Sequence, residues 1–263
     1  SSDVCSSDLI IKNTSKTIEK STEQKEDYTS YDNFDEYVNS ENSWAIIQKK
    51  TNTTQEPEFG SSVDQLPLDP RIIAGLRKSG IENPYKFQVD TLNAILNGES
   101  VVISAPTAAG KTESFLIPII QKILKDPPKN RIFALFIYPT KALASDQARK
   151  INEFLDRCNL LDKIKAMKLD GSVSNTTAEN MHKNKPQILV TNFDSIHSNL
   201  PYGNAKARLF IEPQILVVDE AHSYCSFFGT NVHYLIKRLE RQMTSKPQII
   251  AASATLEIGR AHV

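Results

Sequence analysis

The segment Ala105-Pro106-Thr107-Ala108-Ala109-Gly110-Lys111-Thr112 constrains the fold of this chain more than any other stretch. It follows the apolar run Val101-Val102-Ile103 and precedes a helical pattern that begins near Glu113. A tight loop between a strand and a helix is the setting of a phosphate-binding loop, because backbone N–H groups and the positive helix N-terminus converge on an anion. The alternative is an ordinary strand-to-helix turn with a surface lysine.

Each part of this loop has a predicted task in binding a nucleotide. Lys111 would reach the β- and γ-phosphates, and the Thr112 hydroxyl would hold Mg²⁺. The pattern G-x-x-x-x-G-K-[ST] begins here with Ala105 in place of glycine. The sequence therefore predicts a site for ATP and Mg²⁺, with these cofactor-binding residues: Ala105, Pro106, Thr107, Ala108, Ala109, Gly110, Lys111 and Thr112.

The overall composition excludes several other classes of protein. With 263 residues and a formal net charge of +0, the chain has no global basic field of the kind that marks many nucleic-acid binders. The three cysteines (Cys5, Cys158 and Cys225) form no C-x-x-C pair, so neither a zinc site nor a disulfide framework is indicated. The sequence contains no run of 18 apolar residues, so it predicts no membrane span. These features fit a cytoplasmic protein in a reducing compartment.

Short strands rich in Val and Ile alternate with helical patterns along the chain. We predict strands at 101–103, 132–138, 164–169, 187–190, 215–218 and 248–252, and helices at 71–78, 87–96, 113–125, 142–155 and 231–243. This order predicts an α/β fold with a parallel sheet flanked by helices on both faces. In such sheets ligands bind beyond the carboxyl ends of the strands. Polar clusters follow the predicted strands at those ends.

The apolar run 215–218 is followed at once by two carboxylates, Asp219 and Glu220. Asp219 would hold Mg²⁺, and Glu220 would orient and deprotonate the attacking water. An acidic pair alone is usually a solvated loop, but the upstream Gly110-Lys111-Thr112 favours ATP hydrolysis with Lys111, Asp219 and Glu220 as catalytic residues. His222 is expected to couple the phosphates to the rest of the protein. Gln88 is either a reader of the adenine edge or a solvated helix residue.

The region 10–60 differs in composition from the rest of the chain. It is polar, its part from 21 to 60 is acidic, and it is expected to be a mobile or weakly folded N-terminal arm. Aromatic residues at 28, 31, 34 and 37, followed by Trp44, suit one face of a short helix that docks on the main domain. A stacking platform for nucleic acid is the alternative.

Both ends of the chain lack periodicity and caps. Residues 1–9 and 257–263 resemble translated sequencing adapter, so we exclude them from the predicted fold. The expected organisation is then an arm over 10–60 and one folded domain over 61–256, within a fragment of a longer gene.

The motifs assembled along the chain resemble those of the DEAD/DEAH-box helicases of superfamily 2. Within that family the resemblance is to the Hrq/YprA-type repair helicases, through Pro106-Thr107-Ala108, the segment 191–197, and Asp219 to Tyr224 followed by Phe228-Gly229. Seven matches run in order along residues 66–256: Gln88; Ala105 to Thr112; Pro139-Thr140-Lys141-Ala142-Leu143; Asp170-Gly171; Thr191-Asn192; Asp219-Glu220-Ala221-His222; and Ser253-Ala254-Thr255.

The resemblance implies a RecA-like ATP-binding domain and a set of further functional residues. Thr140, Lys141, Gly171, Thr191 and Asn192 would hold the phosphates of one nucleic-acid strand, with DNA favoured over RNA. Such neutral donors and a single lysine suit contacts with the backbone that do not depend on base sequence. Coupling of the ATP state to the grip on the strand is implied for two residues that follow the last predicted strand, Ser253 and Thr255.

The family also needs a second RecA-like domain, whose motifs do not follow Thr255, so this fragment is expected to hydrolyse ATP poorly. Two alternatives to a helicase are kept open: a P-loop ATPase that does not act on nucleic acid, and a nucleotide-binding module without turnover. Nucleic-acid stimulation of ATP hydrolysis would distinguish all three.

Overall fold

A single parallel sheet forms the centre of the molecule. The computed structural model describes residues 58–106, 109–224 and 226–254, together with the backbone of 9–12, 28–31 and 44–46. The sheet has seven strands in the order β3-β4-β9-β8-β5-β7-β6, and every neighbouring pair is parallel. Their bounds are β3 (Trp44–Ile46), β4 (Ser100–Ser104), β5 (Ala134–Tyr138), β6 (Ala166–Lys168), β7 (Ile188–Asn192), β8 (Ile215–Val218) and β9 (Gln248–Ser253). The six strands expected from the sequence are all present.

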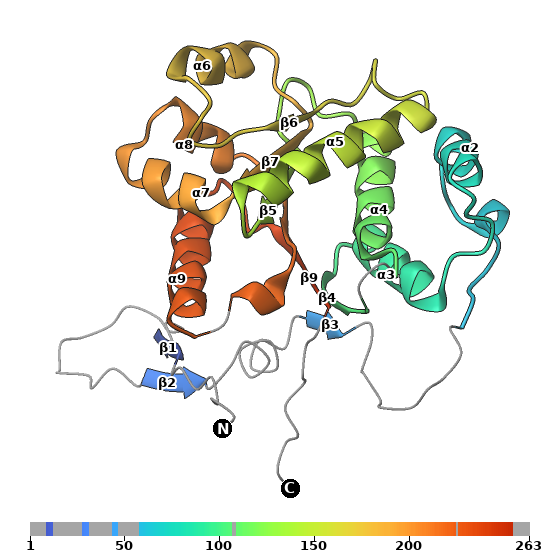
Figure 1. Cartoon of the computed structure of the whole chain (residues 1–263), viewed down its shortest axis with the longest axis horizontal. Helices are drawn as coiled ribbons and strands as arrows, with labels where there is room; N and C mark the ends of the chain where they lie inside the picture. Colours follow the sequence, from blue (N-terminus) through green and yellow to red (C-terminus); the bar gives the residue numbers. More distant parts are fainter. Residues whose placement is uncertain are drawn as a thin grey trace, which may run out of the picture.

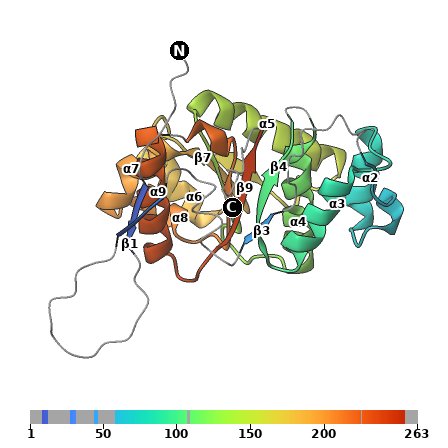
Figure 2. The same cartoon turned by 90° about the horizontal axis from the view of Figure 1, so that it is seen from below.

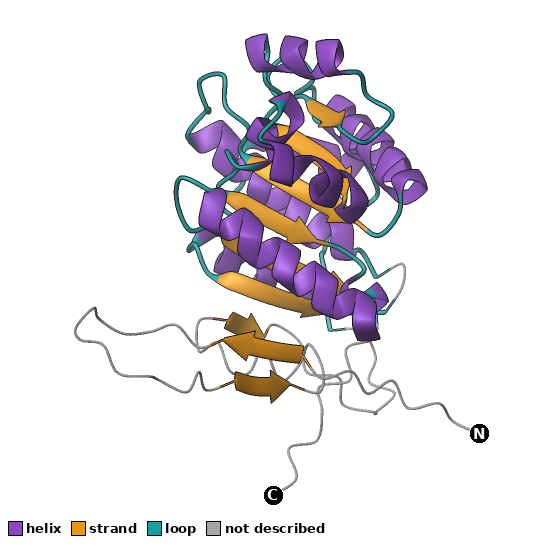
Figure 3. Ribbon diagram, turned by 90° about the vertical axis from the view of Figure 1, so that its left-hand side faces the viewer, coloured by secondary structure: helices purple, strands orange, loops and turns teal. Residues whose placement is uncertain are grey.

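Helices cover both faces of the sheet, as the sequence predicts (Figures 1 and 3). One face packs against α2 (Pro70–Lys78), α3 (Lys86–Leu96), α4 (Lys111–Lys125) and α5 (Lys141–Arg157). The other packs against α6 (Asn175–Lys183), α7 (Phe193–Asn199), α8 (Ala205–Phe210) and α9 (Ser226–Gln242). Figure 2 shows α2, α3 and α4 on one side of the strands and α7, α8 and α9 on the other. The predicted α/β class is therefore confirmed.

Side-chain alternation along β5 explains why the sheet is buried on both faces. Phe136 and Tyr138 belong to the first apolar cluster, whereas Leu135 and Ile137 belong to the second. Successive side chains of a strand point to opposite faces, so a continuous apolar run fills both cores. All five residues of β5 are buried.

Some element boundaries differ from those expected. α4 begins at Lys111 rather than Glu113, because Gly110 adopts a φ of 79° as its N-cap. α9 begins at Ser226 rather than Asn231. The short helices α6, α7 and α8 were not expected at all, although Ser174 caps α6 and Asn204 caps α8 through their side-chain oxygens. Those two caps are the sequence signals that could have located the helices.

The helix expected over the aromatic residues of the arm is wrong where the structure describes that region. Tyr28–Tyr31 is strand β2, which pairs antiparallel with β1 (Leu9–Lys12). Trp44–Ile46 is strand β3, whose Trp44 is in register with Ser100 of β4. β3 thus supplies a partner to what would otherwise be the open edge of the sheet, and bulky residues such as Trp and Ile favour that pairing over a helix.

The rest of the arm up to residue 57 and both expected adapter segments lie outside the described residues, except for the backbone of Leu9. In the described part of the chain, no helix has the length and apolar character needed to cross a membrane.

Candidate nucleotide site and strand-contact edge

The described part of the loop between β4 and α4 ends in a glycine that directly precedes the helix. Gly110 lies in the left-handed region that favours glycine, and helix α4 begins directly after it. The N–H of Ala105 donates to the carbonyl of Ser253 at 3.2 Å, and the N–H of Ala109 donates to that of Pro106 at 3.2 Å. The first bond ties the loop to the end of β9, and the second lies within the loop. The predicted loop residues Thr107 and Ala108 lie outside the described residues.

Lys111 is buried inside the loop it was expected to serve. Its amine donates to the carbonyl of Ala105 at 2.8 Å and to that of Pro106 at 3.1 Å. A phosphate oxygen placed in the loop would therefore have to replace these two carbonyls as the partner of the Lys111 amine. This replacement is favourable because an anionic oxygen binds an ammonium group more strongly than a neutral carbonyl does. Thr112 is half-buried in the first turn of α4.

The end of β8 presents the two predicted carboxylates in different directions. Glu220 has a φ of 52°, which is uncommon for a residue with a side chain. Its N–H donates to Oδ1 of Asp219 at 2.8 Å. Asp219 is buried, and this burial raises its pKa to about 6, against the opposing effects of the Glu220 N–H and Lys111. A buried carboxylate of this kind is stabilised in its charged form by a bound cation.

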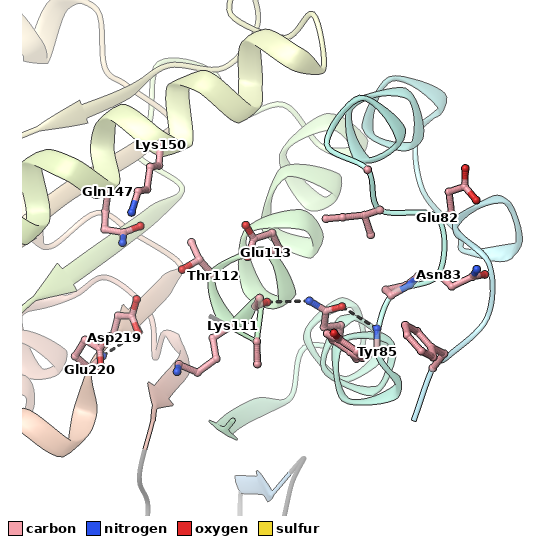
Figure 4. Close-up of a pocket in the computed structure, with 17 residues that line it drawn as sticks. Glu82, Asn83, Tyr85, Lys111, Thr112, Glu113, Gln147, Lys150, Asp219 and Glu220 are labelled. Carbon is pink, nitrogen blue, oxygen red and sulfur yellow. Dashed lines mark hydrogen bonds between the residues drawn. The ribbon is translucent and has the colours of Figure 1, made fainter. Parts of the chain in front are cut away.

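One open cleft of about 820 Å³ joins the phosphate loop to the carboxylate pair. Its lining includes the predicted residues Gln88, Ala109, Gly110, Lys111, Thr112, Asp219 and Glu220. Figure 4 shows Lys111 and Thr112 on one wall and Asp219 and Glu220 on the facing wall. Residues more than one hundred positions apart in the sequence thus meet in one site because β4 and β8 end at the same edge of a parallel sheet.

Gln88 spans the other end of this cleft. Its amide nitrogen donates to the carbonyl of Gly110 at 3.0 Å, and its amide oxygen accepts from the N–H of Tyr85 at 2.9 Å. Both ends of the amide are therefore engaged with the backbone. Of the two roles weighed from the sequence, a solvated helix residue does not describe this position.

Sequence reasoning missed two aromatic residues in the cleft. The rings of Phe59 and Tyr85 stack with centroids 5.2 Å apart, and Phe59 is 61% exposed. Both line the cleft beside Gln88. An exposed ring can stack on a purine. No local pattern marks Phe59, because its place depends on a backbone bridge to Tyr85, which is distant in the sequence.

His222 lies between the carboxylate pair and the end of β9. Its Nδ1 is 3.3 Å from Oε2 of Glu220 and 3.3 Å from Oγ of Ser253. Two of the three expected coupling residues are thus linked to the expected catalytic glutamate. The third, Thr255, lies outside the described residues.

Three of the predicted strand-contact residues lie together at the same carboxyl edge. Thr140 is exposed and caps α5, with its hydroxyl oxygen accepting from the N–H of Leu143 at 3.2 Å. A Cβ atom on Gly171 would lie 3.6 Å from Nζ of Lys141. An exposed hydroxyl, an ammonium group and an accessible backbone are suited to phosphate contacts.

The other two predicted strand-contact residues are placed differently. Thr191 and Asn192 are fully buried. The Thr191 hydroxyl donates to the carbonyl of Leu169 at 2.6 Å, and the Asn192 amide donates to Asp194 at 3.2 Å. In this structure their side chains support the loops after β6 and β7 and are not at the surface with Thr140 and Lys141.

The donor set of the cleft fits Mg²⁺ held partly by a nucleotide. No group of three or more His, Cys, Asp or Glu side chains that could hold a metal ion occurs among the described residues. Mg²⁺ is commonly held by one or two protein oxygens together with phosphates and water, so the pair Thr112 and Asp219 is a sufficient protein contribution. The burial of Asp219 is the observation that favours a cation there.

A phosphate loop after one strand, a carboxylate pair after another and a parallel sheet with helices on both faces define a P-loop ATPase domain of the RecA-like type. Residues 85–262 match the family model described as DEAD/DEAH box helicase. The chain belongs to this family, in agreement with the resemblance inferred from its motifs.

Two curated relatives and one solved structure place the chain within the family. It is 38% identical over 193 residues to the "Uncharacterized ATP-dependent helicase YprA" of Bacillus subtilis, covering 72% of this chain and 25% of the relative. It is 32% identical to the "ATP-dependent helicase hrq1" of Schizosaccharomyces pombe, covering 81% and 20%. The structure of the "DUF1998 helicase MrfA bound to DNA and AMPPNP" aligns with a TM-score of 0.66 at 33% identity, covering 77% and 28%. The chain thus spans about a quarter or less of the length of these curated relatives.

Proposed function

We propose that this chain is the ATP-binding motor domain of a helicase that binds and hydrolyses ATP with Mg²⁺ while it grips a single strand of nucleic acid. The observation that carries the proposal is the shared edge of the sheet. Lys111, Asp219 and Glu220 line one cleft at this edge, and the exposed Thr140 and Lys141 lie at the end of β5, the strand next to β8.

The chemistry on the nucleotide side follows from the residues of the cleft. Lys111 would leave its two carbonyl partners and neutralise charge on the β- and γ-phosphates, and Thr112 and Asp219 would hold Mg²⁺. The metal supplies charge neutralisation on the transferred phosphoryl group. Glu220 would orient and deprotonate the attacking water, so catalysis rests on positioning and electrostatics rather than on a covalent nucleophile.

His222 and Ser253 offer a path from this chemistry to the rest of the domain. A change in the charge or position of Glu220 alters its contact with His222, which also reaches the end of β9. We infer that this pair, together with Thr255, couples the nucleotide state to the grip on the strand.

DNA is the proposed nucleic acid. Support comes from the MrfA structure, whose title gives DNA and AMPPNP as its ligands. We further propose that a second RecA-like domain is needed to complete the site, because the family relies on it for arginine fingers. The 263 residues alone are then expected to hydrolyse ATP slowly.

The test is the ATPase activity of the complete gene product that contains this chain, measured with and without single-stranded DNA and single-stranded RNA. We expect strong stimulation by DNA. Glu220→Gln should abolish turnover but retain nucleotide binding, because the amide keeps the shape of the side chain and loses the base. Lys111→Met should weaken nucleotide binding itself.

Each contrary result identifies a different error. Stimulation by RNA alone would overturn the DNA assignment. Activity indifferent to both polymers would favour a P-loop ATPase that does not act on nucleic acid. Nucleotide binding without turnover under any condition would favour the non-catalytic module.

A further inference from the structure

Helix α5 contributes a side chain to the nucleotide cleft that neither the sequence motifs nor the proposed mechanism uses. Gln147 lines the cleft together with Lys111, Thr112, Asp219 and Glu220. It stands three residues after the buried Ala144 and four before the buried Ile151, so it lies on the inward side of the helix. Figure 4 shows Gln147 and Lys150 projecting from α5 toward the side of the cleft occupied by Thr112 and Asp219.

The side-chain oxygen of Gln147 is in an unusual state. It is buried, and no donor among the described residues forms a hydrogen bond with it. A buried acceptor without a donor is destabilising, so such atoms in native proteins generally have a ligand, water or functional partner.

The two ammonium groups that line the cleft are already engaged elsewhere. The Lys111 amine donates to the carbonyls of Ala105 and Pro106. The Lys150 amine is 2.7 Å from Oδ2 of Asp146 in an ion pair on the exposed side of α5. Neither is the natural partner of the Gln147 oxygen.

The chemistry of the missing donor can be deduced from what the cleft is proposed to hold. The phosphates of ATP carry no hydrogen at neutral pH and can only accept hydrogen bonds. Hydrolysis brings an attacking water to this place, and that water is a hydrogen-bond donor. A glutamine can orient an attacking water in a P-loop enzyme, because its neutral amide oxygen accepts a hydrogen bond from that water.

We propose that Gln147 positions the attacking water at the γ-phosphate end of the cleft, jointly with Glu220. This inference rests on the proposed function. In it Glu220 removes the proton, while the Gln147 oxygen accepts the second hydrogen of the same water and fixes its direction. Gln147 is therefore a water-positioning residue, and its loss lowers the rate of the chemical step rather than the affinity for nucleotide.

The position of Gln147 on α5 gives the contact a second consequence. Lys141 begins this helix and Thr140 caps it. Gln147 lies six residues after Lys141, about 9 Å along the axis of the same rigid helix. A strand held by Thr140 and Lys141 shifts or steadies α5, and Gln147 moves with it. Binding of the nucleic-acid strand thus improves the alignment of the attacking water. In this proposal α5 transmits the stimulation of ATP hydrolysis from the strand to the cleft.

The test uses the complete gene product with Gln147→Leu, Gln147→Glu and a matched control on the same helix, Arg149→Gln. Arg149 is exposed and pairs with Asp146 and Glu153 outside the cleft. For each protein, kcat and KM for ATP are measured with and without single-stranded DNA, together with Kd for Mg·ADP and the thermal midpoint.

Gln147→Leu should lower the DNA-stimulated kcat about tenfold, the equivalent of one good hydrogen bond, with KM and the Mg·ADP Kd within about twofold. Gln147→Glu keeps the acceptor oxygen and should retain most of kcat, although its charge beside Asp219 raises KM. Arg149→Gln should match the parent protein.

Three results would overturn the inference. The first is an unchanged kcat in Gln147→Leu. The second is a weaker Mg·ADP affinity with kcat unaffected, which indicates contact with the ground-state phosphates. The third is a Gln147→Glu variant as slow as Gln147→Leu, which indicates that the amide acts as a donor. If Gln147→Leu does not fold, Gln147→Glu still decides between donor and acceptor. A parent protein as inactive as Glu220→Gln would instead defeat the proposed function itself.

Discussion

The side-chain amide of Gln88 donates to the carbonyl of Gly110 at 3.0 Å, which joins helix α3 directly to the last residue of the phosphate loop. A Cβ atom at Gly110 would overlap that same amide nitrogen. Gly110 is thus required for two separate reasons. Its φ of 79° disfavours any side chain, and the absence of a Cβ leaves room for Gln88.

Gly110→Ala is therefore expected to weaken nucleotide binding by about tenfold or more, because Gln88 must leave its place and the loop must change conformation. It should also lower the free energy of unfolding by about 1 kcal/mol through backbone strain. Titration calorimetry with Mg·ATP and chemical denaturation measure the two effects.

Gly98→Ala is the matched control for that substitution. Gly98 has a φ of 87°, and a Cβ there would meet nothing within 4 Å. Gly98→Ala should lower the free energy of unfolding through backbone strain but leave the affinity for Mg·ATP unchanged. Equal affinity losses in both variants would mean that Gln88 does not act through Gly110.

The strand-to-helix alternation and the ends of the strands could be read from the sequence because both depend on local signals. β8 has the bounds expected from its apolar run, and Asp219 follows it directly. The contacts of the side chains in the phosphate loop could not be predicted from such local signals. Lys111 lies against two backbone carbonyls, a contact that depends on how the loop closes in three dimensions.

Other features escaped sequence reasoning because they arise between distant segments. Phe59 reaches the cleft only through its bridge to Tyr85. β3 pairs with β4, whereas the spacing of the aromatic residues at 28, 31, 34 and 37 suggests a helix that ends near Trp44. Thr191 was expected to hold a phosphate of the strand, and the structure places its side chain inside, in the register of β7 beside β5.

A second prediction concerns the contact between α2 and the end of α5. Gly75 of α2 is buried, and a Cβ there would overlap Sγ of Cys158. Although alanine favours a helix over glycine by about 1 kcal/mol, overpacking of a core site costs about 1–3 kcal/mol. Gly75→Ala should therefore destabilise the domain in urea denaturation.

The pair can be tested with a double-mutant cycle. Cys158→Ala removes the sulfur atom that the new methyl group would meet. In that background the cost of Gly75→Ala should fall by more than half, with a coupling energy of about 1 kcal/mol. Simple additivity of the two substitutions would show that the sulfur is not the obstacle.

A third prediction concerns the pH dependence of stability. Burial lowers the pKa of His233 on α9 from 6.5 to about 4, and Lys237 adds to this shift. Between these values His233 binds more protons in the unfolded chain than in the folded chain, so its contribution to stability is complete above pH 6.5 and is lost as the pH drops toward 4. The loss is on the order of 2 kcal/mol after allowance for solvent screening. The raised pKa of Asp219, about 6, acts in the opposite direction over the lower part of this range.

Chemical denaturation at pH 7.5, 6.0 and 5.0 measures this slope. His233→Gln removes this titrating group, so its stability should fall less than that of the parent protein as the pH drops. His197→Gln changes an exposed histidine of α7 and should leave the pH profile of stability unchanged. A profile for His233→Gln that is as steep as that of the parent would assign the slope to other groups.

The last prediction concerns Tyr138, whose hydroxyl is buried at the end of β5 without a hydrogen-bond partner among the described residues. Burial raises the pKa of Tyr138 well above its usual value, and the nearby charges of Asp219 and Glu220 add to that effect. A buried hydroxyl without a partner destabilises a fold. Tyr138→Phe, which removes only the oxygen atom, should therefore raise the free energy of unfolding by about 1 kcal/mol.

The same substitution separates stability from activity. If the hydroxyl serves the carboxylates when the cleft is filled, Tyr138→Phe should be more stable and yet hydrolyse ATP several-fold more slowly, as expected where a site retains a destabilising group for its chemistry. Thermal midpoints without nucleotide and kcat on the same preparations measure both effects. A less stable variant would show instead that the hydroxyl is satisfied, for example by buried water, and a more stable variant with unchanged kcat would show that Asp219 and Glu220 do not need it.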